Sequence, residues 1–329
     1  MEKTEVTPQK GLYMLDTKLQ DEISKNFNDD IVNKLNNVIF PVELQPIPTV
    51  PQQFGRKVVR TDQASLDGSE VLGLVGSRYK PIPHINAFGG ALLSMKNAEL
   101  DFTDADVQVE TYQNGAMAKM EVLFPKHTTK IGDHDLAVKY VARNSYNGAW
   151  KFQSFFGWLN FVCFNTLVTG QKLAYSANRH TIKFDIDETN QKIQNAVKAI
   201  KDETVNYNNW WQKKVSDEDV VKLFRTTMVG REPTIIEQQT GAKTENTKQL
   251  DVLTKLYEQE VTHIHGGGDN GRGNAQGTLW CAFQAATAWS THLRDALDKG
   301  KRNHILQQHR QTAVRKMITS KQWKQLEVA

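Results

Sequence analysis

Residues 107–124 read VQVETYQNGAMAKMEVLF, and this stretch decides the fold class. Apolar and polar side chains alternate on both sides of Asn114-Gly115, which is the pattern of two strands that each bury one face. Asn-Gly favours the tight turn of a β-hairpin because both residues tolerate the left-handed backbone conformation. The stretch therefore predicts an antiparallel hairpin with strands at Val107–Tyr112 and Met117–Phe124.

Similar short runs, rich in β-branched and aromatic residues, surround this hairpin between residues 57 and 187. Turn dipeptides such as Asp67-Gly68 and Asn147-Gly148 separate the runs. A helix is expected at Ile85–Lys96, after a proline-rich turn. The further predicted strands are Lys57–Arg60, Val71–Val75, Leu136–Ala142, Phe152–Trp158 and Thr181–Asp185. Residues 57–187 are therefore predicted to form an α+β core with an antiparallel sheet.

The segments that flank this core have other patterns. Residues 1–40 are expected to hold an N-terminal helix, since apolar residues recur at every fourth position from residue 15 to residue 31. Four prolines between residues 41 and 51 make residues 41–56 an expected extended connector. Residues 188–293 are expected to be a helical region packed on the core, with helices at Glu188–Trp211, Asp217–Met228, Thr247–Glu260 and Leu279–Leu297. The predicted fold class is thus α+β, with the antiparallel sheet in the middle of the chain and a helical C-terminal half.

Positive charge is concentrated in residues 294–329, a basic C-terminal tail. These 36 residues carry nine basic and three acidic side chains, whereas the whole chain has a net charge of only +4. A basic segment on a near-neutral body suggests an anionic partner. A solvated helix surface without any partner would give the same charge pattern.

The remaining composition is that of an ordinary folded protein. Hydrophobic residues make up 39% of the chain, yet no stretch approaches the roughly 18 apolar residues that a membrane helix needs. Residues 1–10 lack the apolar run of a signal peptide. Cys163 and Cys281 lie in apolar surroundings, which is typical of buried thiols in a reducing compartment. We therefore expect a cytoplasmic protein without membrane contact.

The glycine-rich segment 263–277 has the composition most like that of a binding loop. Glycines let backbone N–H groups approach an anion, and a helix is expected to begin shortly afterwards. The segment has no Walker sequence, and His263, His265 and Asp269 do not form a complete set of metal ligands. A flexible surface loop fits the same residues. No complete catalytic motif is found elsewhere, so we predict no enzymatic activity, no metal and no cofactor.

Basic residues next to aromatic ones give the remaining indication of function. Lysine and arginine contact phosphates, and aromatic rings stack on unpaired bases. Core aromatics surrounded by surface charges would produce the same pattern. The residues predicted to contact nucleic acid are Arg56, Lys57, Arg60, Arg78, Tyr79, Lys80, Lys151, Phe152, Arg179, Arg272, Lys301, Arg302, Arg310, Arg315 and Lys316.

A further set of segments consists of Leu74–Pro81, Asn144–Gly148, Phe161–Gly170 with Arg179–Thr181, Gly277–Trp280 and Ala282–Thr291. These segments resemble the phage- and plasmid-type family numbered 932 among the domains of unknown function. That family usually has an arginine shortly before the cysteine, where this chain has Asn160 and Phe161. The resemblance implies a phage or mobile-element setting in a bacterial cytoplasm, and it brings no established catalytic residues.

Three functions stay open at this point. The first is a non-enzymatic protein that binds single-stranded DNA, or anneals strands in recombination or replication, and works as a homo-oligomer. Ring-forming annealing proteins offer an analogy at the level of the fold, since they also pair a β-sheet with helices and a basic groove. The second is a phage interaction or structural protein that binds a protein partner without nucleic acid. The third is a metal- or nucleotide-dependent enzyme built on residues 263–277.

Overall fold

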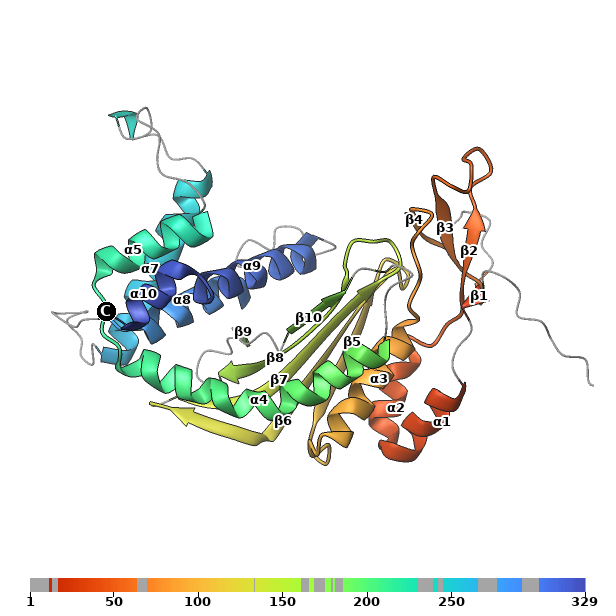
Figure 1. Ribbon diagram of the computed structural model, residues 1–329, viewed down its shortest axis with the longest axis horizontal. Helices are drawn as coiled ribbons and strands as arrows, with labels where there is room; N and C mark the ends of the chain where they lie inside the picture. Colours follow the sequence, from red (N-terminus) through yellow and green to blue (C-terminus); the bar gives the residue numbers. More distant parts are fainter. Residues whose placement is uncertain are drawn as a thin grey trace, which may run out of the picture. The chain divides into compact units, whose positions relative to one another are not determined.

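The chain divides into two compact units, which are described separately. Unit 1 consists of Met1–Pro125, Tyr140–Phe155 and Leu173–Lys198, and unit 2 of Lys126–Lys139, Phe156–Lys172 and Ala199–Ala329. Figure 1 shows the elements of this computed structural model in chain order. The structure describes residues 12–13, 17–63, 70–132, 134–160, 166–168, 175–178, 180, 186–229, 239–241, 245–265, 277–291 and 302–328.

A small antiparallel sheet lies in unit 1. Its described strands follow the order β1-β2-β3-β4, namely Leu12–Tyr13, Val42–Pro46, Arg56–Arg60 and Val71–Val75. Strand β2 lies within the proline-rich residues that were expected to form only an extended connector. Val42, Leu44, Val58 and Leu72 form a buried cluster on one face of this sheet, together with Phe40, Ala116 and Tyr146.

The helices of unit 1 are α1 (Thr17–Asn26), α2 (Asp29–Asn36) and α3 (His84–Asn97). The expectation of one N-terminal helix was wrong, because the Asn28 side chain accepts a hydrogen bond from the Ile31 N–H (3.0 Å) and caps a new helix. Helix α3 confirms the predicted helix at 85–96. Its Gly89 allows close packing on α1, since a Cβ atom there would lie 2.3 Å from Cδ1 of Ile23.

The predicted hairpin is confirmed within a larger antiparallel sheet. Strands β5 (Asp106–Tyr112) and β6 (Met117–Ile131) pair with Tyr112 opposite Met117, and the turn residues Gln113, Asn114 and Gly115 have φ values of 55°, 56° and 88°. The described strands follow the order β10-β8-β7-β6-β5, with β9 beside β8. The remaining bounds are β7 His134–Ser145, β8 Phe152–Asn160, β9 Thr166–Val168 and β10 Tyr175–Asn178.

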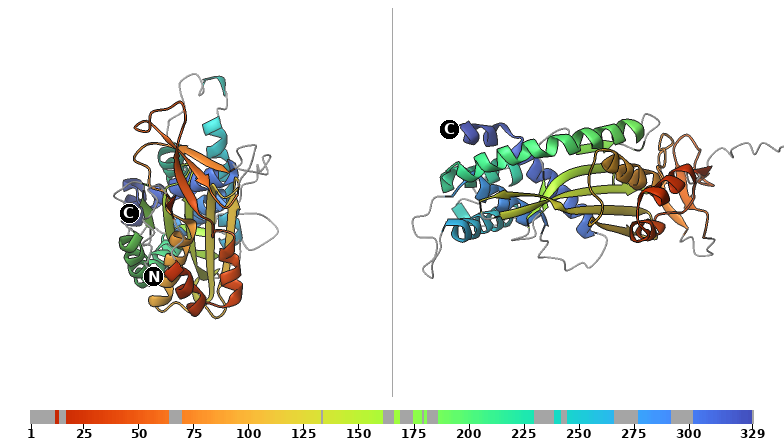
Figure 2. Two further views of the ribbon diagram at one scale, coloured as in Figure 1. Left: turned by 90° about the vertical axis from the view of Figure 1, so that its right-hand side faces the viewer. Right: turned by 90° about the horizontal axis from the view of Figure 1, so that it is seen from below.

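The long strands β6, β7 and β8 lie side by side in the sheet, and both units contain part of each (Figure 2). They confirm the predicted strands of the core but extend beyond the predicted ends. The strand predicted at Thr181–Asp185 lies outside the described residues. The α+β fold class, with an antiparallel sheet in the middle of the chain, is confirmed.

Helices dominate the C-terminal half, as predicted. Ser216 caps α5 by accepting a hydrogen bond from the Asp219 N–H (3.1 Å), which confirms the predicted N-cap. Helix α7 includes His263 and His265, so the glycine-rich segment begins later than expected, and residues 266–276 lie outside the described part. The bounds are α4 Ile186–Gln212, α5 Asp217–Phe224, the π-helix η1 Arg225–Val229, α7 Glu245–His265, α8 Leu279–Thr291, α9 Arg302–Ile318 and α10 Lys321–Val328.

The basic tail folds into α9 and α10 of unit 2. Val314, Met317 and Trp323 are fully buried. The Trp323 ring lies edge-on to Trp210 at 4.9 Å, and Oε1 of Glu327 accepts hydrogen bonds from both indole N–H groups, at 2.7 Å from Trp210 and 3.1 Å from Trp323. These contacts make the described part of the tail a packed portion of unit 2. Among the described helices, none is both long and apolar enough to cross a membrane.

Candidate nucleic-acid interface

A buried hydrogen-bond network in unit 1 begins at His84, the first residue of α3. The His84 ring is fully buried, and its Nε2 lies 2.9 Å from the carbonyl oxygen of Gly115. The Asn144 amide lies 2.8 Å from His84 Nδ1 and also donates to the Ile82 carbonyl oxygen (2.9 Å). Since a carbonyl oxygen only accepts, the proton of the imidazole lies on Nε2 and Nδ1 is the acceptor. The network therefore joins α3 to the end of β7 and to the hairpin turn.

Tyr146 completes the network around His84. Its hydroxyl oxygen accepts a hydrogen bond from the backbone N–H of His84 (2.9 Å), and the two ring centroids lie 4.2 Å apart. Burial lowers the pKa of His84 to about 3, so the imidazole is neutral near pH 7. Burial also raises the pKa of the Tyr146 hydroxyl above its usual value. This neutral network fixes residues 144–146, from which the loop to β8 begins.

The turn at residues 76–80 is held against that loop. The Tyr79 hydroxyl donates to the Ser145 carbonyl oxygen (2.6 Å), and the Tyr79 ring stacks on His180 at 5.2 Å. The Lys80 N–H donates to the His180 carbonyl oxygen (3.2 Å). Burial lowers the pKa of His180 to about 4, so this ring too is neutral near pH 7. The position of the turn is thus fixed by contacts with two other segments.

Four predicted nucleic-acid contacts belong to the segments that meet at this turn. Arg56 donates from Nη2 to the Ser77 carbonyl oxygen (2.6 Å), and Arg78 and Lys80 are exposed on either side of Tyr79. Lys151 is exposed directly after Trp150, whose carbonyl oxygen accepts from the Ser145 hydroxyl (2.8 Å). We call Arg56, Arg78, Lys80 and Lys151 the basic turn cluster.

The sequence around the basic turn cluster is free of acidic residues. No aspartate or glutamate occurs between Val71 and Ala98, or between Leu136 and Phe184. Two large apolar side chains are exposed on the adjoining strands and loop, Phe54 by 69% and Leu74 by 68%. Lys57 is opposite Leu74 in the β3–β4 pair. Exposed cations and exposed apolar surface therefore occur on the same small sheet and its turn.

Three other predicted contact residues make contacts within the fold. Arg60 forms an ion pair with Asp62 (2.7 Å) and lies 4.0 Å from the centroid of the Phe40 ring. Arg310 lies 4.7 Å from the centroid of the Trp289 ring and donates to the carbonyl oxygen of the same residue (2.9 Å). Phe152 is fully buried in β8, so its ring has no surface for a base to stack on, and we correct that prediction.

The remaining predicted residues lie in the C-terminal helices or outside the described part. Arg302 is the first residue of α9, Arg315 is partly buried, and Lys316 is exposed. Arg179, Arg272 and Lys301 lie outside the described residues. The cations of α9 belong to unit 2 and stay predicted contacts.

The network of His84, Asn144 and Tyr146 was not found from the sequence. Its hydrogen bonds join residues that are about 60 positions apart, as in the pair of His84 and Asn144. The signal was the polar run Asn144-Ser145 followed by Tyr146, placed inside an otherwise apolar strand and just before the Asn147-Gly148 turn. Polar residues that are buried in a strand need hydrogen-bond partners, and such a run indicates where to look for them.

The described residues form neither a metal site nor a reactive thiol site. Among the residues that the structure describes, no group of three or more His, Cys, Asp or Glu side chains is placed to hold a metal ion. Cys281 is a free, buried thiol whose pKa is raised by burial, and Cys163 lies outside the described residues. A thiol in this state is a poor nucleophile, because the reactive form is the thiolate.

The fold and site define an α+β protein with a helical C-terminal half and with exposed cations arranged around a buried, neutral hydrogen-bond network. The chain belongs to the family described as a domain of unknown function, DUF932, whose model matches residues 71–317. Comparisons with curated proteins and with solved structures give no significant match. The matched residues include Arg78, Lys80 and Lys151 of the basic turn cluster, whereas Arg56 precedes them.

Proposed function

We propose that the protein binds single-stranded DNA and acts without catalysis, as a DNA-handling protein in strand annealing during recombination or replication of a phage or mobile element. The observation that carries the proposal is the basic turn cluster. It combines four cations from three segments with a rigid, neutral support. No acidic side chain occurs in residues 71–98 or 136–184, so the sequence that flanks Arg78, Lys80 and Lys151 adds no repulsion toward a phosphate backbone.

The exposed apolar side chains add to this proposal. Unpaired bases present apolar faces, and stacking on an aromatic ring contributes about 1–3 kcal/mol per base. Phe54 is 69% exposed on the loop between β2 and β3, and Leu74 with Lys57 lies on the neighbouring strand pair. Tyr79 is a poorer stacking surface because His180 already covers one face of its ring. We therefore propose that phosphates contact the cluster and that a base contacts Phe54.

Strand annealing also requires two strands to be held near each other. A homo-oligomer supplies this arrangement by presenting several basic turn clusters at once. The proposal therefore includes self-association, in the bacterial cytoplasm where the DNA of a mobile element is replicated.

The direct test is fluorescence anisotropy with labelled single- and double-stranded oligonucleotides at several salt concentrations. The test variant is Arg78→Gln/Lys80→Gln/Lys151→Gln, which removes three exposed cations. We expect affinity for single strands to fall at least tenfold and the slope of log affinity against log salt to fall by about 2, because each phosphate contact on a single strand contributes about 0.7.

The matched control is Lys25→Gln/Lys248→Gln/Lys255→Gln, which removes the same charge from exposed helix positions. We expect it to bind within about twofold of the unaltered protein, since none of these three lysines belongs to the proposed contact. Absence of binding, affinity that does not change with salt, or an equal loss in both variants would each overturn the proposal.

A protein partner is the second candidate function, and the exposure of Phe54 and Leu74 favours it specifically. Apolar side chains that are exposed on a sheet and on its adjoining loop are typical of protein contacts as well as of base contacts. Under this hypothesis, Phe54→Ser/Leu74→Ser loses a partner in pull-down from infected cells, whereas oligonucleotides have no effect on the complex. The hypothesis of an enzyme built on residues 263–277 stays a prediction, which metal analysis and nucleotide-induced shifts in melting temperature would test.

A further inference from the structure

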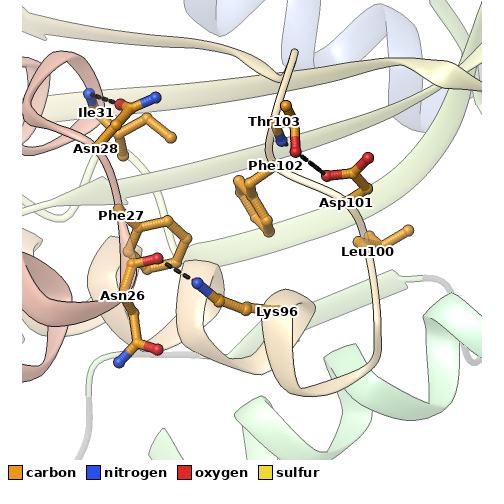
Figure 3. A pocket seen from close by; sticks show the side chains of 9 residues that line it. All are labelled: Asn26, Phe27, Asn28, Ile31, Lys96, Leu100, Asp101, Phe102 and Thr103. Atoms are coloured by element: carbon orange, nitrogen blue, oxygen red, sulfur yellow. Dashed lines mark hydrogen bonds between the residues drawn. The ribbon is translucent and has the colours of Figure 1, made fainter.

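A pocket of about 300 Å³ lies in unit 1, where the junction of α1 and α2 faces the end of α3 (Figure 3). Phe27 and Phe102 provide its apolar wall, with ring centroids 5.0 Å apart and an interplanar angle of 73°. Its other lining residues are Asn26, Asn28, Ile31, Lys96, Leu100, Asp101 and Thr103. The pocket thus combines aromatic rings with several oxygen acceptors, which is a suitable environment for an organic cation.

The chain's own Lys96 already occupies one cation position at this pocket. Its Nζ lies 5.3 Å from the centroid of the Phe27 ring and donates to the Asn26 carbonyl oxygen. An ammonium group is attracted to the face of an aromatic ring and to carbonyl oxygens. The position of Lys96 therefore shows that the aromatic and carbonyl groups of this pocket accommodate an ammonium group.

The charge around the pocket also favours a cationic ligand. Exposed carboxylates occur in both segments that line it, namely Asp29, Asp30, Glu99, Asp101, Asp104 and Asp106. Lys34 balances part of this charge through ion pairs with Asp30 (2.8 Å) and Asp106 (3.9 Å). Negative charge remains in excess, which disfavours a phosphate ligand and favours a lysine or arginine side chain.

Helix α10 in unit 2 presents the complementary chemistry. Lys321, Lys324 and Val328 are spaced three and four residues apart, so they share one helix face, and all three are exposed. Val328 is 85% exposed, whereas Trp323 on the opposite face is fully buried. The free face of α10 thus carries two ammonium groups and one apolar side chain, matching the acidic rim and the aromatic wall.

We propose that the pocket of one copy binds the free face of α10 from a second copy, with Lys324 entering beside Phe27, Phe102 and Asp101. The contact joins two unlike surfaces, so each copy retains one pocket and one α10 for further copies, and assembly is head-to-tail. This inference deepens the self-association that the proposed function includes, and it does not depend on nucleic acid. It specifies a surface through which copies of the chain associate.

The test uses charge reversal on each side of the contact in the full-length chain. Asp29→Lys/Glu99→Lys changes the rim of the pocket, and Lys321→Glu/Lys324→Glu changes α10. Sedimentation velocity at low salt is expected to show self-association of the unaltered protein, with the association constant of each variant reduced at least tenfold because attraction becomes repulsion. An equimolar mixture of the two variants is expected to recover association, since the reversed charges are again complementary.

Matched controls carry the same charge changes at other exposed positions, Glu218→Lys/Glu258→Lys and Lys248→Glu/Lys255→Glu. They are expected to associate like the unaltered protein. The proposal is overturned if the unaltered protein stays monomeric at every concentration, if the controls lose association equally, or if the mixture of reversed variants does not associate. A chemical cross-link between α10 and the pocket within a monomer would overturn the second copy as the occupant.

The pocket variant also separates this inference from the proposed function. Asp29→Lys/Glu99→Lys leaves the basic turn cluster unchanged, so the affinity of a single protomer for a short oligonucleotide is expected to stay within about twofold. Loss of association with retained oligonucleotide binding supports both proposals. Retained association without any oligonucleotide binding rejects only the proposed function.

Discussion

Each unit buries one histidine against one asparagine amide, and the two pairs differ in what surrounds them. In unit 1, His84 lies 2.8 Å from the Asn144 amide and 2.9 Å from the Gly115 carbonyl oxygen. In unit 2, Nδ1 of His134 lies 2.6 Å from the Asn160 amide, and its ring lies edge-on to Trp211 and Trp280 at 5.7 and 5.6 Å. The first pair connects loops that present cations, whereas the second is a polar group within an aromatic cluster.

The two units are also expected to respond to pH in opposite directions. Burial lowers the pKa of His84 to about 3 in unit 1, whereas burial raises the pKa of Glu260 to about 7 in unit 2. A buried histidine resists protonation and a buried carboxyl group resists ionisation, so each unit is least stable at the opposite end of the pH range. The predictions that follow test this contrast, from the largest expected effect to the smallest.

The largest effect is expected in unit 1 on acidification. The pKa of His84 is about 3 in the folded chain and 6.5 in the unfolded chain, so the unfolded state binds more protons between these values. Stability is therefore complete above pH 6.5 and falls as the pH is lowered towards 3, by up to about 4 kcal/mol. Hydrogen exchange followed by mass spectrometry resolves the two units. Equal loss of protection in both units at pH 5 would contradict this prediction.

Removal of the asparagine amides is expected to cost more in unit 1 than in unit 2. Asn144→Ala leaves the Ile82 carbonyl oxygen and His84 Nδ1 without their donor, both in a fully buried environment, and is expected to reduce the free energy of unfolding by about 3 kcal/mol. Asn160→Ala removes the contact with His134 (2.6 Å) and is expected to cost about 1–2 kcal/mol. Urea denaturation of the two matched variants measures the difference, and an inverted order would show that the unit 1 network does not stabilise the fold.

Glu260 on α7 is expected to give unit 2 the reverse pH dependence. Its folded pKa of about 7 exceeds the 4.5 of a glutamate in an unfolded chain, so the folded state binds more protons between pH 4.5 and 7 and stability falls as the pH rises through this range. The loss is expected to reach about 2–3 kcal/mol above pH 7. Glu260→Gln should remove this loss and stabilise the protein at pH 8.

Tryptophan fluorescence is a suitable measurement for Glu260→Gln, because six of the seven tryptophans belong to unit 2. The exposed Glu258 lies on the same helix, and Glu258→Gln provides the control that should keep the pH dependence. If both variants show the same slope of stability against pH, the carboxyl group of Glu260 is not the titrating group.

Much of the fold follows from local patterns, whereas the site depends on contacts that are distant in sequence. Alternation predicted the β5–β6 hairpin, and the Ser216 cap predicted the start of α5. Local patterns did not separate α1 from α2, since the apolar spacing continues through Asn28 although its side chain caps a new helix. Strand β2 was missed because prolines indicate a connector, yet Pro46 is the last residue of the strand.

The candidate site shows the same division. The cations of the turn at 76–80 were predicted from their spacing next to Tyr79, and their exposure agrees with a role at the surface. Phe152 was misassigned because an aromatic residue next to Lys151 gives the same pattern in a core strand and at a binding surface. The packed tail was not foreseen, since the burial of Trp323 depends on Trp210, which lies in another helix.

The smallest effect tests whether the turn at residues 76–80 requires its support. Tyr79→Phe removes the hydrogen bond from the hydroxyl to the Ser145 carbonyl oxygen (2.6 Å) and retains the ring that stacks on His180. A single hydrogen bond of this kind contributes about 1 kcal/mol, so we expect a loss of stability of that size and a decrease of about twofold in oligonucleotide affinity. Tyr112→Phe, which removes a hydroxyl bonded to Glu110, is the matched control and should leave affinity unchanged. Tyr79→Phe could instead lose stability and keep full oligonucleotide affinity. That result would show that phosphates contact the cations without a fixed turn. The contrast between the two histidine pairs would then concern stability alone.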